Sequence, residues 1–326
     1  MTAASFGDTL AARVAERESQ IVLGLDPDPA DLWPADGSSA RAAGATSELT
    51  AARVAAEAAQ ELTAAQLAAR AVLVHCRALI DAAAHACVAV KPQLARFELL
   101  GAAGWSALEA LVAHAHTRGL LVIADAKRGD IDVSARAYAA AMGTGTDSPF
   151  GRIAGLGADL VTVNPLLGAD ALAPFVGAAR EAGTGVLVLV RTSNPGAADI
   201  EELRLQDGGS VWERIAQLVD EVGRPGVGAG GLSDVGAVFG ATAPWHLQRA
   251  RELMPNATFL LPGVGAQGGR VEELAAAFAP GRAGGLVSAS RSIAGAYRVR
   301  GGEPAAAACE EAESLRRSAW ELSVVR

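Results

Sequence analysis

The chain has 326 residues, of which 51% are hydrophobic and 20% are charged, so it can form one large α/β domain and is too apolar for a disordered chain. Its formal net charge of −8 and the lack of a long run of Lys and Arg argue against a nucleic-acid-binding surface. The three cysteines, Cys76, Cys87 and Cys309, are odd in number and widely spaced, which indicates a reducing cytoplasm rather than a disulfide framework or a zinc site. Residues 1–13 do not resemble an export signal and the most apolar window, 71–90, is interrupted by polar and charged residues, so we expect no export and no membrane span.

Short apolar runs rich in Val, Ile and Leu recur along the chain and alternate with helix-like segments. The runs cover 21–25, 86–90, 120–124, 159–163, 185–190, 235–239, 258–261 and 285–288. The helix-like segments, with alanine and spaced apolar positions, include 105–118, 131–142, 169–182, 210–222 and 270–279. Continuous apolar strands alternating with helices predict a parallel sheet that is buried on both faces. Eight such units favour a single (β/α)8 TIM barrel over an open sheet, with the active site at the carboxyl ends of its strands.

Two segments fall outside this alternation, within a single domain spanning 1–326. Residues 31–71 are longer than an ordinary crossover, and we expect a loop followed by an added helix, an N-terminal helical insertion without an assigned role. Residues 303–326 carry Glu and Arg at helical spacings, which predicts a peripheral C-terminal helix.

Charged residues close three of the apolar runs. Asp125, Lys127 and Asp130 follow the third run within six residues, and side chains two apart on a strand share one face. An exposed ion pair and a helix N-cap would explain these three residues equally well if they stood alone. Lys91 and Asp26, however, close two other runs in the same position. The sequence therefore predicts a cluster of alternating charges at the mouth of the barrel.

Two glycine-rich stretches match the pattern G-x-G-x-x-G. The first, 226–231, follows a helix-like segment and precedes a strand, which is the wrong order for dinucleotide binding. The second, 263–268, follows a strand and precedes the predicted helix at 270–279, an order that permits phosphate binding at a helix N-terminus. No acidic residue for a ribose stands about twenty positions onward. Arg291 follows the eighth run, where barrel enzymes often bind phosphate, so a phosphate pocket is favoured over a dinucleotide site or a surface arginine.

Together these motifs resemble orotidine 5′-phosphate decarboxylase, the last enzyme of UMP synthesis, in its longer bacterial type 2 form. Residues 125–131 resemble the D-x-K-x-x-D-I signature of that family. Residues 262–269 look like its phosphate-gripping loop, and 192–196 like its pyrimidine-covering loop. The pattern runs in register from Asp26 to Arg291, which is nearly the whole chain.

The resemblance implies a role for each matched residue. Lys127 would protonate C6 of the pyrimidine within a charge network that it forms with Asp125, Lys91 and Asp130. Asp130 would reach into the site of the partner subunit, which implies a homodimer with shared active sites. At the ribose, the implied contacts are Asp26 and, from across the interface, Ser134. Ser193 would contact the pyrimidine amide, and the loop over phosphate and base would supply Pro262, Gln267 and Gly268. Ser290 and Arg291 complete the implied contacts, with Arg291 on the phosphate. The substrate would be orotidine 5′-monophosphate, with neither a cofactor nor a metal.

The implied chemistry places a strong demand on the charge network. Loss of CO2 from C6 leaves a carbanion that the pyrimidine ring cannot delocalise well, so a preorganised cation held by carboxylates has to stabilise it. Two alternatives stay open. One is a metal-dependent sugar-phosphate lyase or decarboxylase of the same superfamily, which usually has a carboxylate ligand where Lys91 stands here. The other is a catalytically silent barrel that binds a nucleotide as a sensor or scaffold.

Overall fold

The computed structural model describes residues 5–33, 62–206, 208–265 and 267–324. Within these ranges, eight parallel strands close into a barrel in the order β1-β10-β9-β8-β7-β6-β3-β2. The strands are β1 (Ile21–Leu25), β2 (Ala89–Pro92), β3 (Leu121–Arg128), β6 (Leu160–Val163), β7 (Gly185–Arg191), β8 (Val235–Phe239), β9 (Phe259–Pro262) and β10 (Gly285–Ala289). Each predicted apolar run overlaps one of these strands, so the predicted (β/α)8 barrel is confirmed.

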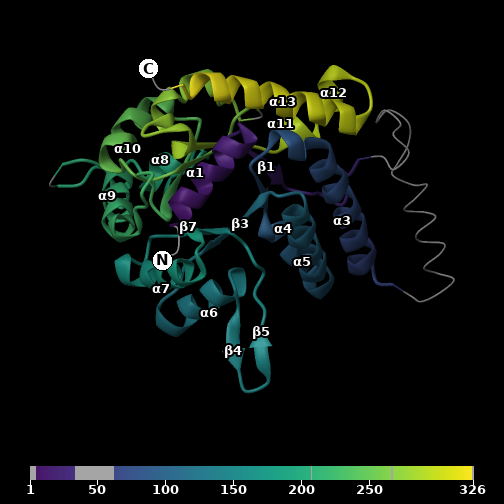
Figure 1. Cartoon of the computed structure of the whole chain (residues 1–326), viewed down its shortest axis with the longest axis horizontal. Coiled ribbons are helices and arrows are strands. Elements are labelled where there is room, and N and C mark those ends of the chain that lie inside the picture. Colours follow the sequence, from purple (N-terminus) through teal and green to yellow (C-terminus); the bar gives the residue numbers. More distant parts are fainter. Residues whose placement is uncertain (1–4, 34–61, 207, 266, 325–326) are drawn as a thin grey trace.

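Helices surround this barrel (Figure 1). The α-helices are α1 (Phe6–Arg17), α3 (Ala64–Ala83), α4 (Leu94–Glu98), α5 (Gly101–Thr117), α6 (Asp132–Met142), α7 (Ala169–Ala182), α8 (Ala197–Ile200), α9 (Val211–Gly223), α10 (Leu247–Leu253), α11 (Arg291–Ala294), α12 (Ala296–Arg300) and α13 (Pro304–Leu322). Short 3-10 turns are η1 (Ala84–Ala86), η2 (Arg224–Gly226), η3 (Pro244–His246), η4 (Val271–Glu273), η5 (Ala275–Phe278) and η6 (Arg282–Gly284). In the described part of the chain, no helix is both long and apolar enough to cross a bilayer.

The apolar side chains form two main layers, one inside the barrel and one outside it. The inner layer joins side chains of the barrel interior such as Val22 and Leu187 to Phe6 and Leu10 of α1. A Cβ on Gly185, the first residue of β7, would lie 2.6 Å from the Phe6 ring, so α1 closes the barrel at the amino ends of its strands. The outer layer lies between the strands and the surrounding helices. One end of the barrel is thus sealed by apolar packing, and the opposite end stays free for chemistry.

The C-terminal segment forms α13, which runs along the top of the view in Figure 1. It begins at a capped end, where the Glu303 carboxylate accepts hydrogen bonds from two backbone amides. Its fully buried alanines, Ala308, Ala312 and Ala319, belong to the outer apolar layer, and the helix contacts α3 and η4. Small side chains at helical spacing therefore let α13 approach its neighbours closely.

The predicted helix at 270–279 is wrong, because the segment forms the two 3-10 turns η4 and η5. Its apolar residues Val271, Leu274 and Phe278 are buried, so the periodic pattern correctly marked burial. Pro280 disfavours helical geometry at the residue before it and has no N–H to donate, and the glycine loop ends only shortly before the segment. The glycine loop therefore does not lead into the α-helix N-terminus that we expected to bind phosphate.

Much of the predicted insertion at 31–71, namely 34–61, lies outside the described residues. The last part of the insertion begins α3, whose start is fixed by a reciprocal capping box between Thr63 and Gln66. On the other side, the Trp33 backbone N–H donates to His75 Nδ1 of α3 at 3.1 Å. Burial lowers the pKa of His75 to about 4, so the ring stays neutral and can accept this bond.

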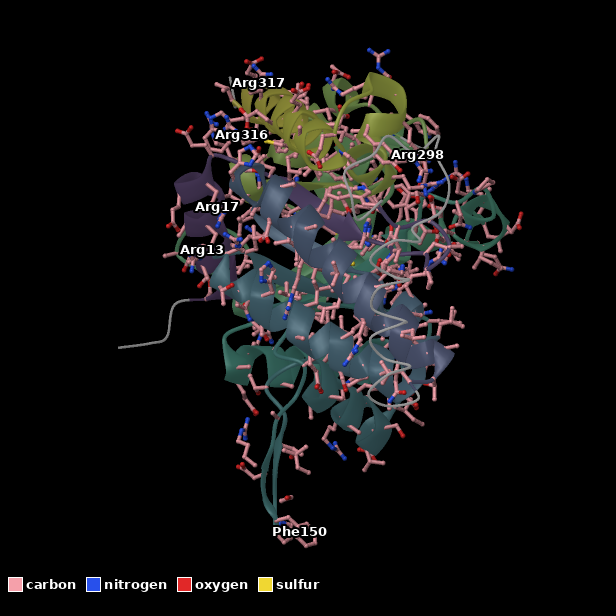
Figure 2. All side chains as sticks on the ribbon, turned by 90° about the vertical axis from the view of Figure 1, so that its right-hand side faces the viewer. Arg13, Arg17, Phe150, Arg298, Arg316 and Arg317 are labelled. Atoms are coloured by element: carbon pink, nitrogen blue, oxygen red, sulfur yellow. The ribbon has the colours of Figure 1, made fainter. Side chains whose placement is uncertain are left out.

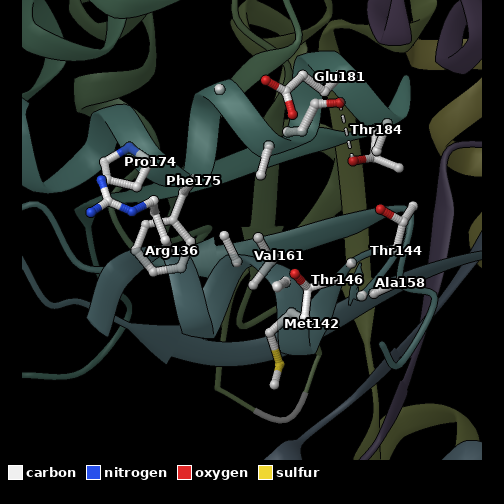
Figure 3. Close-up of a pocket in the computed structure, with 18 of the residues that line it drawn as sticks. Arg136, Met142, Thr144, Thr146, Ala158, Val161, Pro174, Phe175, Glu181 and Thr184 are labelled. Carbon is white, nitrogen blue, oxygen red and sulfur yellow. Dashed lines mark hydrogen bonds between the residues drawn. The ribbon is translucent and has the colours of Figure 1, made fainter. Parts of the chain in front are cut away.

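A two-stranded hairpin, β4 (Thr146–Ser148) and β5 (Gly151–Ile153), projects from the body below α6 and α7 (Figure 1). Figure 2 shows Phe150 at its tip, where the side chain is 99% exposed. Beside the hairpin, a cavity of about 990 Å³ lies between α6 and α7. Figure 3 shows Met142, Val161 and Phe175 among its lining residues. This cavity shares no lining residue with the one at the strand ends described next.

Candidate active site

A second cavity, of about 360 Å³, lies at the carboxyl ends of the barrel strands. Apolar side chains of the barrel interior, Leu189, Val238 and Leu260, line it together with many polar groups. The polar lining comprises Asp26, Lys91, Gln93, Asp125, Lys127, Thr162, Thr192, Ser193, Asn194, Gln267, Ser288, Ser290 and Arg291. A cavity with an apolar floor and convergent polar side chains is typical of small-molecule sites. We therefore take this cavity, and not the larger one between α6 and α7, as the candidate active site.

The Asp125 carboxylate is at the centre of the polar groups. Its Oδ2 accepts hydrogen bonds from Lys91 Nζ at 2.7 Å and from Gln93 Nε2 at 3.1 Å. Its Oδ1 accepts from Lys127 Nζ at 2.5 Å and from Thr162 Oγ1 at 3.1 Å. The Asp125 and Lys91 side chains are 8% and 7% exposed, whereas that of Lys127 is 44% exposed. The array thus has a buried anion and a buried cation beneath a second cation that faces the cavity.

The two ammonium groups determine the charge state of Asp125. Burial alone would raise the pKa of this carboxyl group, but the charges and hydrogen bonds of Lys91 and Lys127 outweigh burial and lower the pKa to about 2. Asp125 is therefore ionised at neutral pH, and the three groups together carry one net positive charge. A pocket with this charge favours an anionic ligand.

Lys91 and Lys127 are the only two lysines in the sequence, which has 28 Lys and Arg residues in total. All other residues in this total are therefore arginines. Arginine stays protonated in proteins, whereas lysine is a compact charge that can give up its proton. Both lysines of the sequence thus belong to the array around Asp125, and Lys127 is the one that faces the cavity.

The backbone at Lys127 departs from regular strand geometry. Its φ of +48° lies in the left-handed region, which non-glycine residues rarely adopt. The pairing of β3 with β6 shifts register between Ala124 and Arg128, so the ladder is interrupted at this residue. Two contacts hold the irregular segment, one from Lys127 N to Thr162 Oγ1 at 2.9 Å and one from Asn164 N to Arg128 O at 2.7 Å. Strain of this kind is common at functional sites.

Most of the substrate contacts that we predicted from the sequence meet in this cavity. Asp26, Ser193, Pro262, Gln267, Ser290 and Arg291 all line it. Gly268 does not line it, although it belongs to the same glycine loop and has a φ of +89°. Gly24 explains how Ser290 reaches the cavity, because a Cβ at position 24 would lie 1.7 Å from Ser290 Oγ. A side chain on that residue of β1 would push the serine away.

Asp130 and Ser134 do not line the cavity of their own chain. Ser134 is exposed, whereas Asp130 is half-buried, and its Oδ1 accepts a hydrogen bond from the backbone N–H of Ile131 at 2.8 Å. Ile131 and Val133 beside them are also exposed, at 56% and 67%. The predicted action of Asp130 and Ser134 in a partner's site stays a prediction.

The sequence reasoning did not single out Gln93, Thr162 or Ser288 as site residues. Gln93 stands two residues after Lys91, and Ser288 two residues before Ser290, so the period of a strand could have found both. Thr162 was the harder case, because threonine is common in strands and its neighbours are apolar. In the described part of the chain, His, Cys, Asp and Glu side chains do not form a group of three that could hold a metal ion.

The fold and the lysine–carboxylate array at its open end are those of a (β/α)8-barrel enzyme. Residues 38–305, more than half of the chain, match the family described as orotidine 5′-phosphate decarboxylase / HUMPS. An orotidine 5′-phosphate decarboxylase of Deinococcus radiodurans is 46% identical over 216 residues, which are 66% of this chain and 74% of that protein. The chain therefore belongs to the orotidine 5′-phosphate decarboxylase / HUMPS family.

Solved structures agree with this family. The OMP decarboxylase of Leishmania donovani has a TM-score of 0.66 at 30% identity, with 96% of this chain and 99% of that chain covered. The UMP synthase of the same organism has a TM-score of 0.67 at 31% identity, with 96% of this chain covered. The present chain spans 57% of the length of that UMP synthase.

We predict that Asp125→Asn destabilises the protein in a pH-dependent manner, because it leaves the buried Lys91 ammonium without a counter-charge. The folded-state pKa of Asp125 is about 2 and its ordinary value is 3.8, so the stability from its ionisation is fully present above about pH 4. This contribution, about 2 kcal/mol, is lost as the pH falls from about 4 towards 2. Urea unfolding of the wild type and of Asp125→Asn across this pH range measures the difference between their free energies of unfolding, which should narrow as the pH falls.

The exposed Asp147, which pairs with Arg152 and is 85% exposed, supplies the matched control. Asp147→Asn should leave the free energy of unfolding nearly unchanged at every pH. A gap between wild type and Asp125→Asn that already narrows above about pH 5 would contradict the low pKa of Asp125.

Proposed function

We propose that this protein is a cytoplasmic enzyme that decarboxylates orotidine 5′-monophosphate to UMP without a cofactor, in the synthesis of pyrimidines. The observation that carries the proposal is the array of Lys91, Asp125 and Lys127, with a buried carboxylate between two ammonium groups at the mouth of the barrel. Family membership supports the same reaction, since its relatives include proteins named for it.

The lining of the cavity suits the parts of this substrate. Arg291 and Gln267 lie at the ends of β10 and β9, where they could hold a phosphate beside the glycine loop. Asp26, at the end of β1, could accept a hydrogen bond from a ribose hydroxyl, and Ser193 could bind the pyrimidine amide. The cavity volume of about 360 Å³ is within the range of small-molecule sites.

In the proposed reaction, the bond between C6 and the carboxylate breaks, CO2 departs, and the electron pair stays on C6. Lys127 Nζ, held by Asp125, directs its positive charge at this carbon and so stabilises the developing negative charge. The ammonium then gives a proton to C6, which yields UMP, and the neutral amine regains a proton from solvent. Lys91 compensates the charge of Asp125 from the buried side throughout.

The phosphate end contributes without taking part in bond breaking. Binding energy from Arg291 and Gln267 would serve to close the loops and align C6 with Lys127. Each tenfold in rate corresponds to about 1.4 kcal/mol of transition-state stabilisation, so one charge-assisted hydrogen bond to phosphate has a measurable effect. Asp125 also lies where it could repel the carboxylate of the bound substrate, a smaller part of the proposal.

We include in the proposal a homodimer in which Asp130 and Ser134 of one subunit complete the site of the other. Neither side chain lines the cavity of its own chain, Ser134 is exposed, and the apolar residues Ile131 and Val133 beside them are exposed as well. An exposed apolar patch next to polar residues is typical of an interaction surface. The subunit contact would then bring a second carboxylate towards Lys127.

Loss of the Lys127 ammonium tests the chemical role directly. We expect Lys127→Ala to lower kcat by at least about 1000-fold, because both the stabilising charge and the proton donor are gone. The measurement is the absorbance change on conversion of orotidine 5′-monophosphate, together with circular dichroism to verify the fold. Lys127→Arg keeps the charge beside Asp125 but cannot release a proton, so it should stay folded and nearly inactive. Near-normal turnover in Lys127→Ala would reject the assigned role.

Mixing two inactive variants tests the shared site. Lys127→Ala and Asp130→Asn, unfolded and refolded together, should recover about a quarter of the wild-type sites, because half of the random dimers contain one intact site. The matched control mixes Lys127→Ala with Asp125→Asn. These two residues belong to one chain's array, so each site of a mixed dimer keeps a defect and no activity should return. Equal outcomes for the two mixtures would contradict the shared site.

The second candidate function is a metal-dependent sugar-phosphate lyase or decarboxylase of the same superfamily, which shares the D-x-K-x-x-D pattern. Lys91 argues against it, because an ammonium at the end of β2, 2.7 Å from Asp125 Oδ2, would repel a metal ion there. We therefore expect exhaustive chelation to leave turnover of orotidine 5′-monophosphate unchanged. A loss of activity that Mg²⁺ restores would favour the metal-dependent class.

A further inference from the structure

One buried hydroxyl group lies between the two residues that the proposed reaction needs most. Thr162 lies on β6 and is 1% exposed. Its Oγ1 is 2.9 Å from the backbone nitrogen of Lys127 and 3.1 Å from Asp125 Oδ1. A single side-chain atom of a neighbouring strand thus contacts both the backbone of the candidate proton donor and the carboxylate that holds its ammonium group.

The direction of each hydrogen bond follows from the donors available. The Lys127 N–H can only donate, so Thr162 Oγ1 accepts from it. The single proton of the hydroxyl group can then go to Asp125 Oδ1 or to Ala124 O, which lies farther away at 3.5 Å. The carboxylate is closer and charged, and hydrogen bonds to charged acceptors are the stronger ones. Thr162 therefore receives from the backbone of Lys127 and donates to Asp125.

The conformation of Lys127 explains why these bonds matter. Its φ of +48° is a strained geometry for a residue with a side chain. The break in the ladder between β3 and β6 deprives the Lys127 N–H of a regular strand acceptor. Thr162 Oγ1 replaces that acceptor, and without it the strained backbone has less reason to keep its geometry. The ammonium group at the end of the side chain would then lose its fixed position.

We propose that Thr162 is a positioning residue for this reaction, holding Lys127 in its strained conformation and fixing the carboxylate of Asp125 at once. The inference rests on the proposed function. Thr162 acts through Lys127 and Asp125, whereas phosphate, ribose and base are bound by other side chains of the cavity. Its loss should therefore lower kcat and leave KM unchanged.

The kinetic test compares three variants. Thr162→Val keeps the shape of the side chain and removes only the hydroxyl group, and we expect kcat to fall about 10- to 100-fold, since a buried donor loses its partner. Thr162→Ser restores the hydroxyl group and should recover most of kcat. Thr258→Val is the matched control, because Thr258 is also a buried threonine. It stands directly before β9, and its Oγ1 donates to Ala283 O at 3.0 Å, outside the cavity lining. This control should keep wild-type kcat.

A second measurement is independent of turnover. Because the sequence has only two lysines, protein labelled with ¹⁵N-lysine gives backbone amide signals from Lys91 and Lys127 alone. The Lys127 amide should exchange slowly with solvent in the wild type and in Thr162→Ser, and quickly in Thr162→Val. The Lys91 amide should exchange at the same rate in all of them.

Wild-type kcat in Thr162→Val, or a Lys127 amide that exchanges rapidly in the wild-type protein, would overturn the inference. The wild-type exchange measurement decides the matter even where Thr162→Val does not fold. Failure of the proposed function has a different signature, namely wild-type protein that does not convert orotidine 5′-monophosphate while its Lys127 amide is still protected.

Discussion

The site depends on one carboxylate kept ionised inside the protein by two ammonium groups. Asp125 is buried deeply enough that burial alone would favour its neutral form, yet Lys91 and Lys127 bring its pKa to about 2. The dependence is mutual, because Lys91 is also buried and needs the carboxylate as its counter-charge. Lys127 alone reaches the solvent side, so the charge of the whole array is presented to the cavity at a single point.

The barrel brings the charged residues together and holds them in place. Strands β2, β3 and β6 are neighbours in the closed sheet, so Lys91, Asp125 and Thr162 meet although they are far apart in the sequence. Apolar packing by α1 seals the amino ends of the strands and leaves polar groups to the opposite end. Charges placed by such a rigid scaffold need little reorganisation when a ligand binds.

Much of this architecture could be predicted from the sequence, because buried parallel strands are almost wholly apolar and charges at their ends stand out. Lys91 and Asp125 were found in this way. The segment 270–279 misled the prediction because a buried 3-10 turn and a helix can show the same apolar spacing. Thr162 was not predicted because its role depends on a hydrogen bond across strands to a residue with positive φ. Neither feature can be recognised from the neighbouring residues in the sequence. Asp130 gives a different lesson, since it does not line the cavity of its own chain and one chain cannot test a contact predicted between two.

The restriction of lysine to two positions has a practical consequence. Coupling esters, aldehydes and crosslinkers that attack primary amines normally label a protein all over its surface. Here, besides the α-amino group, such reagents would find Lys127 at 44% exposure and Lys91 at only 7%. Among the side chains, immobilisation or fluorescent tagging through amines would thus be directed to Lys127 in the pocket, where an occupant of the cavity would shield its ammonium group.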